Sequence, residues 1–134
     1  GAACHTGERS CFFREIETSF KDVEASQRDV STASIIDRVH GVILERKSNP
    51  GERSYVSSLF IKGVDTILKK IGEETSELLI SGKGGNRDEV IHEMADLWFH
   101  TLVLLGYLDI TPEEIYGELK RRFGTSGIEE KERR

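Results

Sequence analysis

The chain has 134 residues and a formal net charge of -5, a size that suits one domain with a real core. Charged residues of both signs make up 32% of it and are mixed, so neither a nucleic-acid-binding surface nor a polybasic membrane patch is expected. Its longest apolar run, around Leu102–Leu105, is far shorter than the roughly 18 residues of a membrane span, and no leader-like segment opens the chain. We therefore expect a cytoplasmic protein with no nucleic-acid and no membrane partner.

The first clear helix signal begins at Ser34, a good N-cap residue, whereas residues 1–33 show no sustained period. Apolar residues then recur at helical spacing from Ile35 onward until an Asn-Pro-Gly segment, which predicts a helix over 34–47. A short helical turn around 55–61 follows.

The next predicted helix carries apolar residues from Val64 to Leu79 and ends at the segment "SGKGGN". That segment lacks the Lys-Ser/Thr ending and the preceding strand of a phosphate-binding P-loop, so it predicts a helix–helix connector. A third helix is predicted over 87–107, the most apolar stretch of the chain.

The segment "TPEE" predicts the start of a fourth helix. Thr111 is its expected N-cap, Pro112 takes the first helical position, Glu114 completes a capping box, and Gly124 ends the helix. Because neither an internal repeat nor strand alternation is evident, these elements predict an all-α, four-helix bundle.

Carboxylates crowd the second of these helices, where Glu73, Glu74 and Glu77 lie within about one turn. In helical projection Glu74 borders the apolar arc, Glu77 is its neighbour one turn on, and Glu73 lies furthest round, toward solvent. On its own this pattern is more typical of an ordinary exposed face.

The third helix changes that interpretation. Glu89, Glu93, Asp96 and His100 fall within about 60° of each other, and most of the remaining circumference is apolar, which predicts a largely buried helix. Buried carboxylates are costly unless they are paired or bind a metal ion, so a positive group is expected among them.

That positive group could be Lys69 and Lys70, in a purely structural ion network, or a divalent cation. Oxygen ligands from two facing helices suit Mg²⁺ or Mn²⁺, which retain waters, join substrate phosphates to carboxylates and place a water for attack. A zinc site is disfavoured because no cysteine or His-Glu-x-x-His pair is present in these helices. A di-iron centre would need a second Glu-x-x-His pair besides Glu89 and His92.

Three segments strongly resemble the phosphoribosyl-ATP pyrophosphatases of histidine biosynthesis, which are MazG-like all-α nucleotide pyrophosphatases: "SYVSSLFIKGVDTILKKIGEETSELL", "EMADLWFHTLVLL" and "ELKRRFGTSGIEEKERR". The resemblance covers residues 34–134. In that family "EExxE" followed by "ExxD" is the metal motif, and its positions here are Glu73, Glu74, Glu77, Glu93 and Asp96.

The resemblance implies Mg²⁺-dependent hydrolysis of N1-phosphoribosyl-ATP to phosphoribosyl-AMP and pyrophosphate, with Mn²⁺ as an alternative ion. The metal ligands that it implies are Glu74, Glu77, Glu93 and Asp96. One of these, or Glu73, would help to deprotonate the attacking water. The basic residues that it suggests for the substrate phosphates are Lys62, Lys69, Lys70, Arg121 and Arg122.

Other side chains of the third helix have ordinary explanations as well. His100 could be a hydrogen-bonded core histidine or a participant in the site, and Trp98 and Phe99 suit core or dimer packing better than base stacking. The resemblance also implies a homodimer or higher homo-oligomer, in which a neighbouring copy could complete the site.

The segment "ACHTGERSCFF" resembles the C-terminal end of phosphoribosyl-AMP cyclohydrolases, in which Cys4 and Cys11 would match two zinc ligands. We therefore expect residues 1–18 to be the remnant of a cyclohydrolase domain fused to this one, with 19–33 as a linker. Two reduced cysteines without a role are an equally good interpretation.

Two other functions remain open from the sequence. A MazG-like enzyme that clears noncanonical nucleoside triphosphates would use the same carboxylates. A non-catalytic helical dimerisation module would instead pair its acids with lysines.

Overall fold

A computed structural model describes residues 35–124 and 127–134, and within these ranges every regular element is a helix. The helices are α2 (Ile35–Ser48), α3 (Tyr55–Lys62), α4 (Val64–Gly84), α5 (Arg87–Tyr107), α6 (Pro112–Arg122) and α7 (Gly127–Glu132). The predicted all-α class is confirmed, and the four long helices are present close to their predicted bounds. The short turn before the second long helix is a separate helix, α3, and α7 was not predicted.

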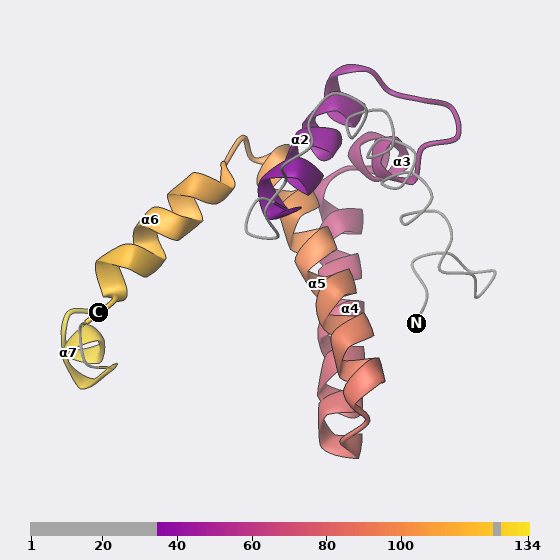
Figure 1. Ribbon diagram of the computed structural model, residues 1–134. Coiled ribbons are helices and arrows are strands. Elements are labelled where there is room, and N and C mark those ends of the chain that lie inside the picture. The colour runs from indigo at the N-terminus through magenta and orange to yellow at the C-terminus, as the bar shows by residue number, and fades with distance from the viewer. Residues whose placement is uncertain (1–34, 125–126) are drawn as a thin grey trace, which may run out of the picture.

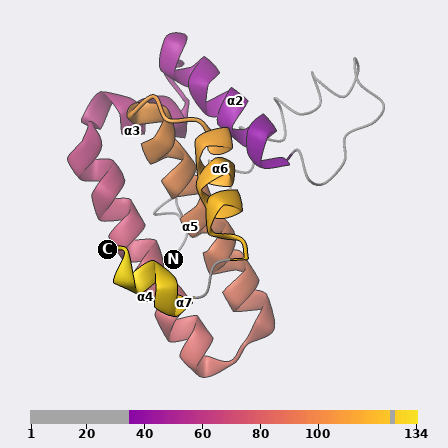
Figure 2. The same cartoon turned by 90° about the vertical axis from the view of Figure 1, so that its left-hand side faces the viewer.

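Helices α4 and α5 form a long antiparallel hairpin, whose two arms lie side by side in both views (Figures 1 and 2). Only two residues connect them. Gly85 ends α4 in the left-handed conformation with φ of 75°, which glycine adopts without steric cost. Asn86 then begins α5 by accepting a hydrogen bond from the Glu89 backbone N–H at 3.2 Å. The glycine-rich segment is therefore a helix–helix connector, as predicted.

Helices α2 and α3 pack against the end of the hairpin that is opposite this connector (Figure 1). Gly63, with φ of 95°, separates α3 from α4 and allows the chain to change direction between them. The core at this end consists of Ile43, Val56, Leu59, Ile67, Phe99, Leu102 and Val103. Phe99 is thus a core residue. The hairpin is anchored at one end, and most of its length projects from this core.

The Thr-Pro-Glu-Glu segment starts α6 as predicted, because Glu114 Oε2 accepts a hydrogen bond from the Thr111 backbone N–H at 2.8 Å. The helix ends at Arg122, just before Gly124. Figure 1 shows α6 extending away from the hairpin, and its main contacts are with α2.

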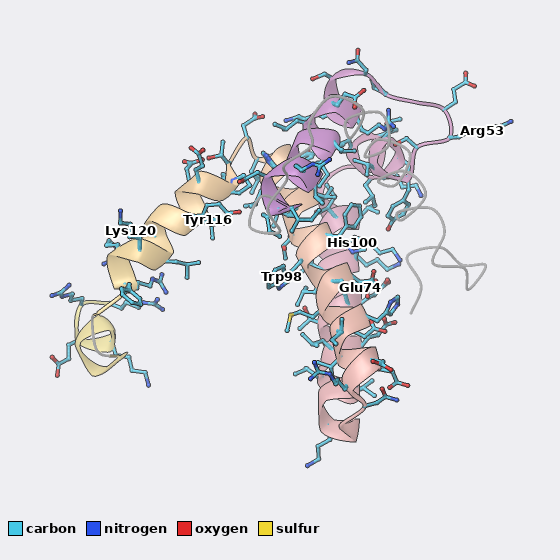
Figure 3. All side chains as sticks on the ribbon, viewed as in Figure 1. Arg53, Glu74, Trp98, His100, Tyr116 and Lys120 are labelled. Carbon is cyan, nitrogen blue, oxygen red and sulfur yellow. The ribbon has the colours of Figure 1, made fainter. Side chains whose placement is uncertain are left out.

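One side of α5 is exposed, although the sequence predicts that this helix is largely buried. Ile91, Met94 and Trp98 are all solvent-accessible, Trp98 by 54%. Trp98 lies on the opposite side of the hairpin from Glu74 (Figure 3). The prediction differs because α4 covers only one side of α5 within a single chain.

None of the described helices combines the length and apolar character that a membrane crossing requires. Cys4, Cys11, the predicted cyclohydrolase remnant and the predicted linker all lie outside the described residues.

Candidate metal centre

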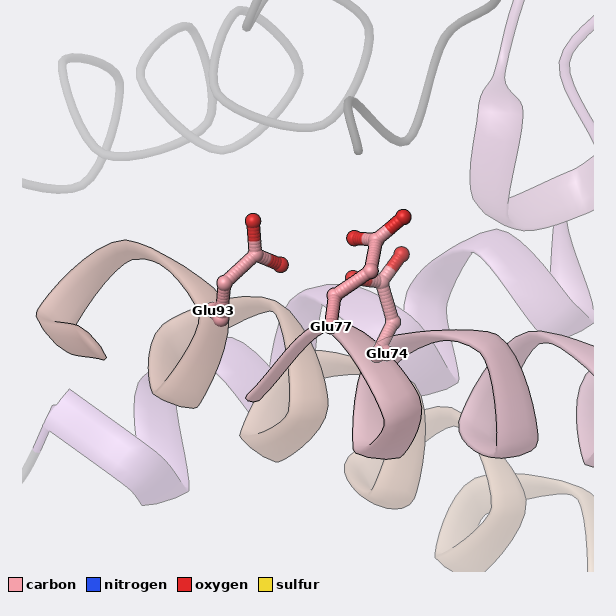
Figure 4. Close-up of side chains that lie close together, drawn as sticks. All are labelled: Glu74, Glu77 and Glu93. Carbon is pink, nitrogen blue, oxygen red and sulfur yellow. The ribbon is translucent and has the colours of Figure 1, made fainter. Parts of the chain in front are cut away.

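Three carboxylates converge midway along the hairpin. Glu74 and Glu77 come from α4 and Glu93 comes from α5, and one oxygen from each lies within 4.8 Å of the others (Figure 4). Positions 74 and 77 share a face because residues three apart are neighbours on a helix. The antiparallel partner helix brings Glu93 alongside them. Three of the four residues predicted as metal ligands are therefore grouped in space.

Glu74 is the most buried member of this cluster, with 2% of its surface exposed. Its burial, together with the negative charges of Asp96 and Glu93, raises the pKa of Glu74 to about 7. Helical projection had placed this residue only at the border of the apolar arc. The adjoining α5 buries it further, and ionising all the acids here is costly unless a cation joins them.

Asp96, the fourth predicted ligand, lies beside the cluster but outside the group of oxygens that converge within 4.8 Å. It is 1% exposed, and its Oδ2 lies 3.3 Å from His92 Nε2. His92 precedes Asp96 by four residues and so faces it on the same helix. The i, i+4 spacing is a sequence signal for this pair, which the Glu-x-x-His interpretation of Glu89 and His92 does not use.

Glu73 lies nearer to solvent than the cluster and is paired with lysines. Lys70 Nζ donates to Glu73 Oε2 at 3.1 Å, and Lys69 Nζ lies 4.0 Å from Oε1. Lys69 is exposed, whereas the Lys70 side chain is mostly buried. Both lysines thus form ion pairs with Glu73, which does not belong to the converging group.

The remaining predicted residues are not brought to the cluster within one chain. Lys62 is exposed in the last turn of α3, and Glu89 is exposed in the first turn of α5. Arg121 and Arg122 hold Glu118 on α6 at 2.7 and 2.8 Å. Figure 3 shows α6 well away from Glu74.

The donor set suits a hard divalent cation. Among the described residues, Glu74 Oε2 is a buried oxygen without a hydrogen-bond partner, and a buried carboxylate is costly when it ionises unless a cation pairs with it. Carboxylate oxygens are the ligands that Mg²⁺ and Mn²⁺ prefer. The cluster can therefore hold a metal ion.

These features define a class: all-α proteins in which two facing helices present clustered acids that can hold a cation. A family model described as phosphoribosyl-ATP pyrophosphohydrolase matches residues 36–123. The chain is 66% identical over 100 residues to a phosphoribosyl-ATP pyrophosphatase of Geotalea daltonii, covering 75% of this chain and 94% of the relative. With that of Geobacter metallireducens it shares 63% identity over 97 residues, covering 72% and 89%. The chain belongs to the phosphoribosyl-ATP pyrophosphohydrolase family, which confirms the resemblance found in the sequence.

Proposed function

We propose that this chain hydrolyses N1-phosphoribosyl-ATP between its α and β phosphates and releases phosphoribosyl-AMP and pyrophosphate, the second step of histidine biosynthesis, in the cytoplasm. Two findings together support the proposal: the chain belongs to the phosphoribosyl-ATP pyrophosphohydrolase family, and three acids within the matched residues lie close together. The matched residues include Glu74, Glu77 and Glu93, whose carboxylates converge on one point. The match spans 94% of a relative that bears this activity in its name.

We propose Mg²⁺ as the ion, with Mn²⁺ as an alternative, and Glu74, Glu77, Glu93 and Asp96 as its ligands. When bound, such an ion stabilises charge on phosphate oxygens and lowers the pKa of a coordinated water. Asp96 would serve from the edge of the cluster, with His92 Nε2 at 3.3 Å from its Oδ2.

The protein's own groups would orient the substrate and move the proton. Glu73, or a carboxylate of the cluster, takes a proton from the attacking water. The water oxygen bonds to the α phosphorus, the bond from that phosphorus to the α–β bridging oxygen breaks, and pyrophosphate leaves with the electron pair. Lys70 pairs with Glu73 and is mostly buried, so it could contact a substrate phosphate held there, while Lys62 and Lys69 are exposed to solvent.

We propose that the protein works as a homodimer. Apolar side chains are exposed on α5, on α6 and directly after it: Leu119 of α6 faces solvent, and Phe123, the residue after α6, is 90% exposed. A second copy covering these surfaces would bury them. Arg121 and Arg122, which lie away from the cluster in their own chain, would meet substrate phosphates only from a partner's α6.

The domain assignment remains a proposal. We assign residues 34–134 to the pyrophosphatase domain, 19–33 to a linker and 1–18 to the end of a fused cyclohydrolase domain, with Cys4 and Cys11 as former zinc ligands. The sequence resemblance described above supports this division.

Measuring pyrophosphate release tests the proposed activity. The purified chain should hydrolyse phosphoribosyl-ATP with Mg²⁺, and chelation with EDTA should abolish turnover. A panel of noncanonical deoxynucleoside triphosphates should be poorer substrates by kcat/KM. Faster turnover of that panel would favour a house-cleaning pyrophosphatase instead.

A further inference from the structure

The partly buried Tyr55 of α3 and the buried His100 of α5 form a hydrogen-bonded pair outside the acid cluster. His100 is 0% exposed, and its Nε2 lies 2.9 Å from the Tyr55 hydroxyl oxygen. The other ring nitrogen, Nδ1, lies 2.8 Å from the backbone carbonyl oxygen of Asp96. The imidazole therefore joins a tyrosine on one element to the backbone of a proposed metal ligand on another.

The acceptors determine where the proton of the imidazole lies. The Asp96 carbonyl can only accept, so Nδ1 carries the proton and donates it. Nε2 is then an acceptor, and the Tyr55 hydroxyl donates to it. Burial lowers the pKa of His100, which is consistent with a neutral ring that makes both bonds.

Packing holds the three partners in place. The His100 ring meets Phe99 edge-on at 5.0 Å and 76°, and Tyr55 at 6.0 Å and 84°. Tyr55 is the first residue of α3, and Ser54 caps that helix by accepting from the Ser57 backbone N–H at 3.0 Å. The tyrosine hydroxyl is thus presented from the capped first turn of α3.

We propose that Tyr55 and His100 are positioning residues, which hold the Asp96 turn of α5 in the orientation that the acid cluster needs before a cation binds. The proposal rests on the proposed function. In a helix the Asp96 carbonyl is the usual acceptor for the backbone N–H of His100, four residues later. The His100 side chain is a second donor to the same carbonyl and so restrains that turn of α5. Partners behind the ligands of a metal site typically tune its affinity in this way.

The test compares Tyr55→Phe with Tyr107→Phe, a matched control whose ring stacks on Phe60 in the same core. In the metal-free protein, NMR should show the His100 Nδ1–H proton exchanging slowly in the wild type and in the control, but rapidly in Tyr55→Phe. Mn²⁺ affinity, measured by calorimetry, should fall about 10-fold in Tyr55→Phe alone. At saturating Mg²⁺, kcat should fall while KM for phosphoribosyl-ATP changes less than about 2-fold.

A second pair of variants separates positioning from packing. Asparagine at position 100 can place an amide N–H where Nδ1–H lies, whereas leucine fills the core but donates nothing. We expect His100→Asn to bind Mn²⁺ more tightly than His100→Leu, even if it is the less stable protein. A purely structural histidine predicts the reverse order, which would overturn the proposal.

Equal Mn²⁺ affinity and equal kcat in Tyr55→Phe and Tyr107→Phe would also overturn it. If Tyr55→Phe does not fold, the order of the two His100 variants decides the question. A wild type that binds Mn²⁺ but does not hydrolyse phosphoribosyl-ATP would contradict the proposed function, and the NMR and Mn²⁺ measurements would still test the positioning role.

Discussion

Two glutamates of this chain have opposite electrostatic surroundings. Glu74, in the hairpin, is buried among other acids, and its pKa is raised to about 7. Glu118, exposed on α6, accepts hydrogen bonds from Arg121 at 2.7 Å and Arg122 at 2.8 Å, and these hold its pKa at about 2. The charge on α6 is balanced by its own helix, whereas the hairpin gathers negative charge that an ion from outside can balance.

The difference between Glu118 and Glu74 distinguishes a surface ion network from a candidate metal site. The network on α6 arises from residues three and four apart and needs no other element. The cluster exists only because two helices face each other, and burial together with the neighbouring acids raises the pKa of Glu74 there.

The largest effect should come from neutralising a cluster acid. Glu77→Gln or Asp96→Asn should lower turnover on the order of 100-fold, the scale on which single charge-stabilising groups act in active sites. The fold should persist, as judged by circular dichroism, because each change removes like-charge repulsion. Glu118→Gln is the matched control and should keep turnover within about 2-fold. A double variant, Glu77→Gln with Asp96→Asn, that retained wild-type turnover would refute the site.

The raised pKa of Glu74 predicts a pH dependence of the metal-free protein. In the folded state this carboxyl holds its proton up to about pH 7, but in the unfolded chain it releases the proton near its ordinary pKa of 4.5. Stability should therefore fall as the pH rises from 4.5 through 7, by up to about 3 kcal/mol. Urea unfolding at several pH values with EDTA should show this fall.

Glu74→Gln is the reference for that experiment, because it removes the titration and keeps the shape. The difference in unfolding free energy between wild type and variant should change across the window. Since His40 and His100, whose pKa values are lowered by burial, contribute to both proteins, they cancel in this difference. Parallel curves would show that Glu74 does not titrate as proposed.

Adding Mg²⁺ should restore the stability that the ionised cluster loses. At pH 7.5 and a concentration 100 times the Kd, binding to the folded state stabilises by about 2.7 kcal/mol. Differential scanning calorimetry should show a higher Tm with MgCl₂ than with NaCl at equal ionic strength. In Glu93→Gln this difference should shrink, while a Tm shift equal to that of the wild type would exclude Glu93 as a ligand.

The smallest effect should come from the exposed network. Glu118→Gln should leave the Tm nearly unchanged, and any shift should vanish at high salt, because exposed ion pairs contribute little and are screened. Thermal melts at low and high NaCl would check this. A large, salt-independent loss would mean that Glu118 supports contacts beyond its own helix.

Local signals made much of the fold predictable. Gly85, Asn86 and the Thr111–Glu114 capping box act within a few residues, so their sequence patterns mark helix ends directly. The same holds for the i, i+3 spacing that places Glu74 and Glu77 on one face. These predictions required no knowledge of how helices pack.

The sequence predicted less about the burial of side chains and the contacts between helices. The apolar circumference of α5 predicts burial, but it does not say whether its own chain or another surface covers Trp98. The sequence places Glu89, Glu93, Asp96 and His100 along one line of α5, but it does not say which of them converge with the acids of α4. Of these four, only Glu93 belongs to the group formed with Glu74 and Glu77. Asp96 turns toward His92, a partner that its spacing allowed but did not require.

The four long helices, their approximate ends and the acidic stretches of α4 and α5 follow from the sequence, because periodicity and capping depend on neighbours along the chain. Tertiary structure alone decided that Glu74 is deeply buried, that His100 joins Tyr55 to the Asp96 turn, and that α6 lies away from the acids. The physical reason is that burial and contacts between helices depend on which surfaces meet in space, and the spacing of residues along one helix does not specify its partner.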